Sequence, residues 1–312
     1  MTALSLATQP AKEAAPPPVP WRNMLWVTWR QHRATLISVP AVLGALAVSL
    51  WIAGLWVHHN YGVLMACRSA CGNLNVEFNH TDWTTGNTLD ILMHLVPPLI
   101  GAFAGCSLLA RDLETGTYRY AWTQGFGRVR WTIAKLTIVA VTVTVLTAAF
   151  SLVFTWFFTP FLAPNQDLTV LSATVFDTRP VSFAAWTLVA FSIGALGGMF
   201  FRRTVPAMAV TLGVYIGLQV VTWLFLRKNY LPPVVTSGPV RLGGGPVPFG
   251  SGPMNANMPW VLSNWTSGHT AYTSYIPVSR FWPMQFIEGG WLLVLSVLLM
   301  AATVWLVRRR AA

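Results

Sequence analysis

The sequence predicts an all-α integral membrane protein with six transmembrane helices. Charged residues make up 9% of the chain and hydrophobic residues 54%, whereas a soluble domain uses about 25% charged residues. Six apolar runs contain no Asp, Glu, Lys or Arg, and each meets the length of about 20 residues that crosses a bilayer, the last one marginally. The runs cover residues 34–57, 91–110, 136–158, 181–201, 204–226 and 289–307.

The distribution of charge predicts the orientation of these spans. If the segments between the runs alternate across the membrane, one side has 14 of the 20 Lys and Arg residues and 3 of the 9 acids, and therefore the whole net charge of +11. The other side has 6 basic and 6 acidic residues. Because cytoplasmic loops are enriched in Lys and Arg, both termini are predicted to be cytoplasmic. Membrane orientation thus explains the charge, and nucleic acid is not an expected partner.

The segment before the first span has two predicted parts. Residues 1–20 form an Ala- and Pro-rich tail that we expect to be disordered and cytoplasmic, and not a cleavable signal peptide, because the first apolar run starts after residue 33. In residues 21–33, Trp21, Leu25 and Trp29 recur at helical spacing among three arginines. This pattern favours an amphipathic helix on the cytoplasmic leaflet; a simple basic anchor is the alternative.

The cysteines suggest one covalent link. Cys67 and Cys71 lie in the predicted outer loop, where a disulfide is permitted, and their spacing leaves the bond feasible but open. Cys106 lies inside the second span and is interpreted as a packing residue.

Prolines and glycines predict local features of the spans. The Pro-Pro pair at 97–98 removes two backbone donors and should kink the second span. Gly101 and Gly105 have the Gly-x-x-x-Gly spacing that allows helices to pack closely, and Gly213 and Gly217 repeat it in the fifth span.

The cytoplasmic loop 111–135 is the most charged stretch of the chain. A short helical pattern opens at Asp112 and Glu114, and Gly125 and Gly127 interrupt it before the third span. A short helix parallel to the membrane could act as a lever between a cytoplasmic motor and the spans. The alternative is a basic loop that only fixes topology.

The longest outer segment covers residues 227–288. Residues 231–253 are rich in Gly and Pro without periodicity, so we expect irregular structure there. Residues 271–288 are aromatic and are expected to return to the membrane surface as short segments before the sixth span.

The sequence lacks the motifs of several chemistries. No Gly-x-x-x-x-Gly-Lys-Ser/Thr loop is present, so no nucleotide hydrolysis by that motif, no enzyme activity and no cofactor are predicted. His58, His59, His80 and Asp82 do not form a recognisable tetrahedral metal site, and no metal is predicted. Asp90 and His94 would share a helix face and could bind a proton or cation, or be a helix-end Asp and a hydrogen-bonded His.

Three segments resemble the membrane permease subunits of ABC-type exporters of the second class. They are Glu114-Thr115-Gly116-Thr117 with Trp122-Thr123-Gln124 and Arg128-Val129-Arg130-Trp131, the segment 21–33, and Ser279-Arg280-Phe281-Trp282-Pro283 with Gln285 and Glu288 before the last span. The resemblance implies an elbow helix before span one, a coupling helix in loop 111–135, and re-entrant helices before span six. It also implies two permeases, identical or related, working with two separate ATPase subunits. The expected ATPase contacts are Glu114, Gly116, Thr117, Tyr118 and Arg119.

The predicted function is therefore the permease subunit of an ATP-driven exporter in a bacterial cell membrane. The apolar, aromatic spans favour a hydrophobic or amphipathic substrate such as a drug, a lipid-like molecule or a peptide. One rival is an ion-coupled secondary transporter that uses Asp90 and His94. Another is a membrane anchor or sensor that does not transport. The Gly/Pro-rich outer loop 227–270 is long for the family, so the resemblance does not define the outer gate.

Overall fold

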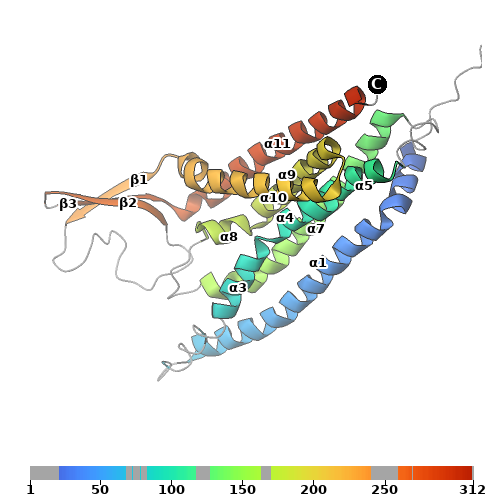
Figure 1. The fold of residues 1–312 in the computed structure, drawn as a ribbon. Helices are drawn as coiled ribbons and strands as arrows, with labels where there is room; N and C mark the ends of the chain where they lie inside the picture. The colour runs from blue at the N-terminus through green and yellow to red at the C-terminus, as the bar shows by residue number, and fades with distance from the viewer. Residues whose placement is uncertain are drawn as a thin grey trace, which may run out of the picture.

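The computed structural model describes residues 21–67, 72, 78, 83–116, 127–162, 170–239, 259–268 and 270–310. Within these ranges, six helices are long and apolar enough to cross a membrane. They lie side by side as a bundle, with α1 along one edge, α11 along the other, and a small sheet beyond one end (Figure 1). The predicted fold class of an all-α protein with six spans is confirmed; the predicted tail 1–20 lies outside the described residues.

The first span belongs to one long helix, α1 (Trp21–Ala66). Its 46 residues correspond to about 69 Å, more than twice the ~30 Å hydrocarbon core. Residues 21–33 are helical, as expected, but they continue into the span without a break. Residues 33–39 include no glycine or proline that would end a helix there, and Pro40 lies inside α1. The position of this segment on the membrane surface stays a prediction.

The second span is broken where the prolines predict a kink. Helix α3 (Trp83–Met93) ends before a turn at His94 and Leu95, and α4 (Val96–Ile100) begins with the prolines in its first turn. Proline is tolerated there because the first amides of a helix lack intrahelical partners. The chain continues as a π-helical segment, η2 (Gly101–Cys106), and then as α5 (Ser107–Thr115).

Glycines bring the second span against the fourth at backbone contact distance. Helix α9 (Pro180–Phe201) is the most buried of the spans, and η2 packs on it. A Cβ atom added to Gly194 would lie 2.2 Å from the Gly101 carbonyl oxygen, and one added to Gly105 would lie 2.5 Å from the Phe191 carbonyl oxygen. The close packing predicted for Gly101 and Gly105 is therefore confirmed.

The other spans surround α9. Helix α7 (Arg128–Phe158) packs between α1 and α9 and ends in the 3₁₀ turn η3 (Thr159–Leu162). A short helix, α8 (Ala173–Asp177), precedes α9. The fifth span consists of α10 (Thr204–Val221), the π-helical η4 (Thr222–Leu226) and η5 (Arg227–Asn229). The sixth is α11 (Phe281–Arg310), preceded by the 3₁₀ turn η6 (Val278–Arg280).

The segment before the sixth span contains a β-sheet, so the expectation of re-entrant helices there is wrong. Strands β1 (Val234–Pro239), β2 (Trp260–Ser267) and β3 (Thr270–Ile276) form an antiparallel sheet in the order β1-β3-β2. Val234 pairs with Tyr275, and Trp260 pairs with Ile276. β3 is rich in β-branched and aromatic residues, which favour a half-buried strand. β1 also replaces part of the irregular structure expected for 231–253; residues 240–253 lie outside the described residues.

The two described cysteines have different roles. Cys67 is disulfide-bonded, and Cys71, the partner that the sequence offers, lies outside the described residues. Cys106 is a buried free thiol whose sulfur lies 3.2 Å from the Thr211 hydroxyl. It packs between spans two and five, as its position inside an apolar run predicts.

Candidate functional site

The end of α5 and the start of α7 flank the predicted coupling loop. Helix α5 ends at Thr115, and Gly116 follows in the left-handed conformation with φ of 71°. Gly127, with φ of 66°, precedes the first residue of α7. Glycine adopts positive φ without the steric cost that other residues meet, so both glycines suit sharp changes of chain direction. Thr117, Tyr118 and Arg119, three of the expected ATPase contacts, lie outside the described residues.

A buried ion pair joins the two helices at the base of this loop. The Nζ atom of Lys135 on α7 lies 2.5 Å from Oδ2 of Asp112 on α5, and the Lys135 side chain is 1% exposed. The ammonium also lies over the ring of Trp131, 3.8 Å from its centroid. A buried ammonium requires such partners because desolvation of an unpaired charge is costly. The pair fixes α5 and α7 relative to each other.

Glu114 joins α5 to the fifth span. The backbone N–H of Thr204 donates to Oε1 of Glu114 at 2.7 Å, and the Thr204 hydroxyl donates to Oε2 at 2.9 Å. Thr204 is the first residue of α10, so the carboxylate satisfies an unpaired amide at a helix N-terminus, where negative charge is favoured. The preceding turn holds Arg202 at φ of 55°. Glu114 therefore has a positioning role within this chain, and its contact with an ATPase stays a prediction.

A second polar cluster lies at the opposite end of the bundle, and sequence reasoning missed it. Arg227 donates through Nε to Glu288 Oε2 at 3.1 Å and through Nη2 to Glu288 Oε1 at 2.9 Å. Nη2 also donates to Asp177. The guanidinium stacks over the ring of Phe176, 4.5 Å from its centroid. Arg227 and Glu288 are fully buried, so η5, α8 and α11 are joined by charge at the end of the bundle that is predicted to be outer.

Neutral groups complete this outer cluster. The Trp186 indole N–H donates to Glu288 Oε1 at 2.9 Å, and the Gln219 amide donates to Asp177 Oδ2 at 2.9 Å. Gln285 accepts from the Ser182 N–H and donates to the Phe176 carbonyl oxygen. Spans four, five and six thus meet in one hydrogen-bonded network. Burial raises the pKa of Asp177 to about 6, because desolvation and Glu288 outweigh the attraction of Arg227.

The signal for the outer cluster was the position of its charges. Arg227 directly follows the fifth apolar run, Glu288 directly precedes the sixth, and Asp177 lies just before the fourth. Glu288 belongs to the segment before the last span that carries the family resemblance, but no pairing of the three charges was predicted. Their equal depth on the outer side, where the net charge is zero, could have indicated that they pair.

Asp90 and His94 lie at the break in the second span. The His94 imidazole Nδ1 is 2.8 Å from the backbone carbonyl oxygen of Asp90, which matches the interpretation of a hydrogen-bonded histidine. The Asp90 carboxylate is buried, and Thr174, Thr178 and Arg179 are polar neighbours of it. Within the described residues, no group of three His, Cys, Asp or Glu side chains is placed to hold a metal ion; His80 and Asp82 lie outside this part.

Comparison with known proteins assigns the family. A family model described as "ABC-2 membrane transporter related" matches residues 40–227, more than half of the chain, from within α1 to the start of η5. No curated protein and no solved structure matches. The matched range includes the second, third and fourth spans, most of the first and fifth, and the loop between α5 and α7. Permeases of this family are transmembrane components that are not catalytic themselves, and they work with an ATPase partner. The chain belongs to the ABC-2 membrane transporter related family and is an ABC-2 type permease.

Proposed function

We propose that this chain is the permease subunit of an ATP-driven exporter in a bacterial cell membrane, and that a separate ATPase docks on loop 111–135. The observation that supports this proposal most strongly is a pair of polar contacts between helices at the base of that loop. Lys135 with Asp112 joins α5 to α7, and Glu114 with Thr204 joins α5 to α10. A force applied at the loop therefore acts on three spans together.

These two contacts suggest how ATP binding in the partner changes the conformation of the permease. Closure of the ATPase moves the loop, and α5 transmits the displacement to α7 through the ion pair and to α10 through the helix cap. Gly116 and Gly127 allow the loop to leave both helices at sharp angles. We propose that Glu114, Gly116, Thr117, Tyr118 and Arg119 form or border the docking surface of the ATPase.

The character of the spans supports a hydrophobic or amphipathic substrate. Their described surfaces are mostly apolar, and the buried charges of Lys135, Arg227 and Glu288 are engaged in ion pairs at the two ends of the bundle. A charged substrate would require polar groups along its route. Drugs, lipid-like molecules and peptides fit this description.

A second permease, identical or related, would complete the exporter. The fifth span supports this part of the proposal because most of its apolar side chains are exposed, among them Val214 and Trp223. A Cβ atom added at Gly213 or Gly217 would meet nothing within 4 Å. Small residues of this kind allow another helix to approach closely.

Replacement of Gly116 tests the docking proposal. Proline cannot adopt φ of 71°, so Gly116→Pro should distort the loop where it leaves α5. Gly268→Pro is the matched control, because Gly268 also has positive φ and open surroundings but lies in the turn between β2 and β3. We expect Gly116→Pro to lose the co-purifying ATPase while inserting into the membrane normally, and Gly268→Pro to keep it. Equal retention by both variants would contradict docking at this loop.

The ion-coupled alternative makes a different prediction. If Asp90 and His94 drove transport, replacement of either would abolish proton-dependent transport, and no ATPase would co-purify with the wild-type chain. Under our proposal, transport requires ATP, and Asp90→Asn acts through folding at the outer end of the second span.

A further inference from the structure

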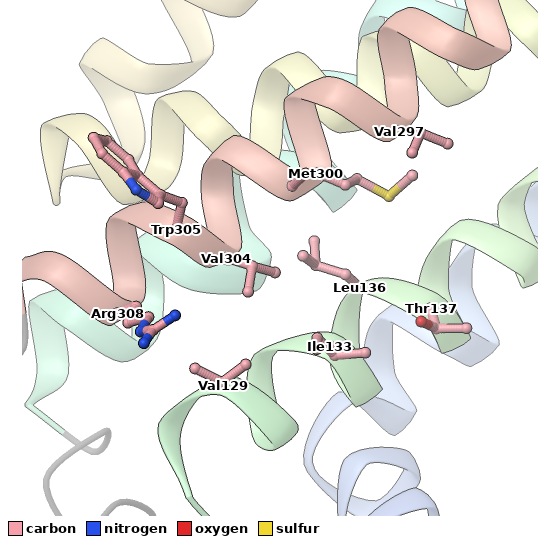
Figure 2. A pocket seen from close by; sticks show the side chains of 10 residues that line it. Val129, Ile133, Leu136, Thr137, Val297, Met300, Val304, Trp305 and Arg308 are labelled. Carbon is pink, nitrogen blue, oxygen red and sulfur yellow. The ribbon is translucent and has the colours of Figure 1, made fainter.

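A long apolar groove lies between α7 and α11 (Figure 2). Its volume is about 610 Å³. Four residues of α7 form one wall and six of α11 form the other. They are Val129, Ile133, Leu136 and Thr137 on α7, and Val297, Met300, Ala301, Val304, Trp305 and Arg308 on α11.

The groove has the depth of one membrane leaflet. Along α11 it extends from Val297 to Arg308, about 16 Å at the rise of an α-helix, and the hydrocarbon core is about 30 Å thick. Arg308 belongs to the basic C-terminal end of the chain, which the charge distribution places in the cytoplasm. The groove therefore starts at the cytoplasmic headgroup level and ends near the bilayer centre.

One cationic group lies at the headgroup end of this apolar surface. Arg308 and Val129 lie together at one end in Figure 2, whereas Val297 and Thr137 lie at the other. Among the described residues, no carboxylate pairs with the exposed Arg308. Its neighbour Arg309 stacks on the ring of Trp305, 4.3 Å from the centroid. Arg308 is thus placed to bind an anion, and the apolar residues of the groove are placed to contact hydrocarbon.

We propose that this groove binds an anionic phospholipid of the cytoplasmic leaflet, with an acyl chain between α7 and α11 and the phosphate at Arg308. An apolar wall one leaflet deep with a guanidinium at the headgroup level matches the two parts of such a lipid. Arginine suits this role because its planar donors bind phosphate oxygens in pairs. The lipid is a resident ligand of the permease, so the inference does not depend on which substrate is exported.

The headgroup part is tested with the purified full-length chain and defined lipids. Native mass spectrometry compares retention of phosphatidylglycerol and phosphatidylcholine by the wild-type protein, Arg308→Gln, Arg308→Lys and Arg309→Gln. We expect Arg308→Gln to lower the preference for phosphatidylglycerol by about fivefold, the loss corresponding to ~1 kcal/mol for one basic residue at an anionic surface. Arg308→Lys should keep most of the preference, and Arg309→Gln, whose guanidinium stacks on Trp305, should lower it less than Arg308→Gln does. An unchanged preference in Arg308→Gln would overturn the proposal.

The acyl-chain part is tested at Ala301, which is exposed in the middle of the groove. Ala301→Trp should fill the groove and reduce retention of both lipids. Because this variant could also disturb folding, Ala301→p-benzoylphenylalanine provides a second readout after irradiation in phosphatidylglycerol vesicles. A lipid adduct that phosphatidylglycerol forms in preference to phosphatidylcholine supports the proposal. Cross-linking of two copies of the chain, or equal labelling by both lipids, would overturn it.

Discussion

Lys135 on α7 and Asp112 on α5 form a buried ion pair, with 2.5 Å between Nζ and Oδ2, at the base of the loop that is proposed to receive the ATPase. The two residues are 23 positions apart, and most of the loop lies between them. The pair joins the two helices that flank the loop, so we expect a displacement of α5 to be transmitted to α7.

The ion pair predicts that a single substitution strongly destabilises the protein and that a second substitution recovers most of the loss. Asp112→Leu leaves the Lys135 ammonium buried without its carboxylate, and loss of one partner of such a pair costs about 3 kcal/mol. The double variant Asp112→Leu/Lys135→Met replaces both charges and should recover most of that loss. Unfolding of the detergent-solubilised protein measures both effects. A double variant as unstable as the single one would show that the pair itself does not explain the loss.

The cap formed by Glu114 predicts a loss of coupling. Glu114→Ala removes both hydrogen bonds to Thr204, and Thr204→Val removes the one from the hydroxyl. In membranes that contain the ATPase, we expect transport per ATP hydrolysed to fall in Glu114→Ala and to fall less in Thr204→Val, with ATPase retained in both. If Glu114→Ala instead loses the ATPase, Glu114 contacts the partner directly.

The glycine contacts predict different effects of the same substitution in two spans. Gly194→Ala places a methyl group against the Gly101 carbonyl oxygen, and overpacking of this kind costs about 1–3 kcal/mol. Gly213→Ala meets nothing within 4 Å in the single chain and should not destabilise it. Unfolding measurements on the two purified variants test this difference. Comparable destabilisation would contradict the described packing of α9 against η2.

Asp177 predicts a pH dependence of stability. Its pKa is raised from 3.8 to about 6 in the folded protein, so the folded state binds the proton more tightly than the unfolded chain. The Asp177 carboxyl contributes most to the free energy of unfolding below pH 3.8. Its contribution falls as the pH rises from 3.8 to about 6 and is constant above that. From about pH 4 to about pH 6, the wild type should lose more stability than Asp177→Asn does. Parallel pH profiles of the two proteins would contradict this origin.

The sequence predicts the features that single segments determine. It does not predict contacts between segments that lie far apart in the chain. Each span is a long uncharged run, and charge asymmetry orients them all, so the six helices follow from local composition. The Arg227–Glu288 contact joins positions 61 residues apart, and no local pattern marks it. The sheet was missed because β1 lies in a Gly/Pro-rich stretch and its partners come later in the chain. Within the predicted docking site, Glu114 has a partner on α10 that lies 90 residues away.

The most direct test of the central claim is native mass spectrometry of the wild-type chain, purified from its own membrane in mild detergent. We predict a complex that contains an ATPase subunit, with two permeases, identical or related, and two ATPases. The complex should disappear in the variant Gly116→Pro. A wild-type chain that purifies without any ATPase would contradict the account.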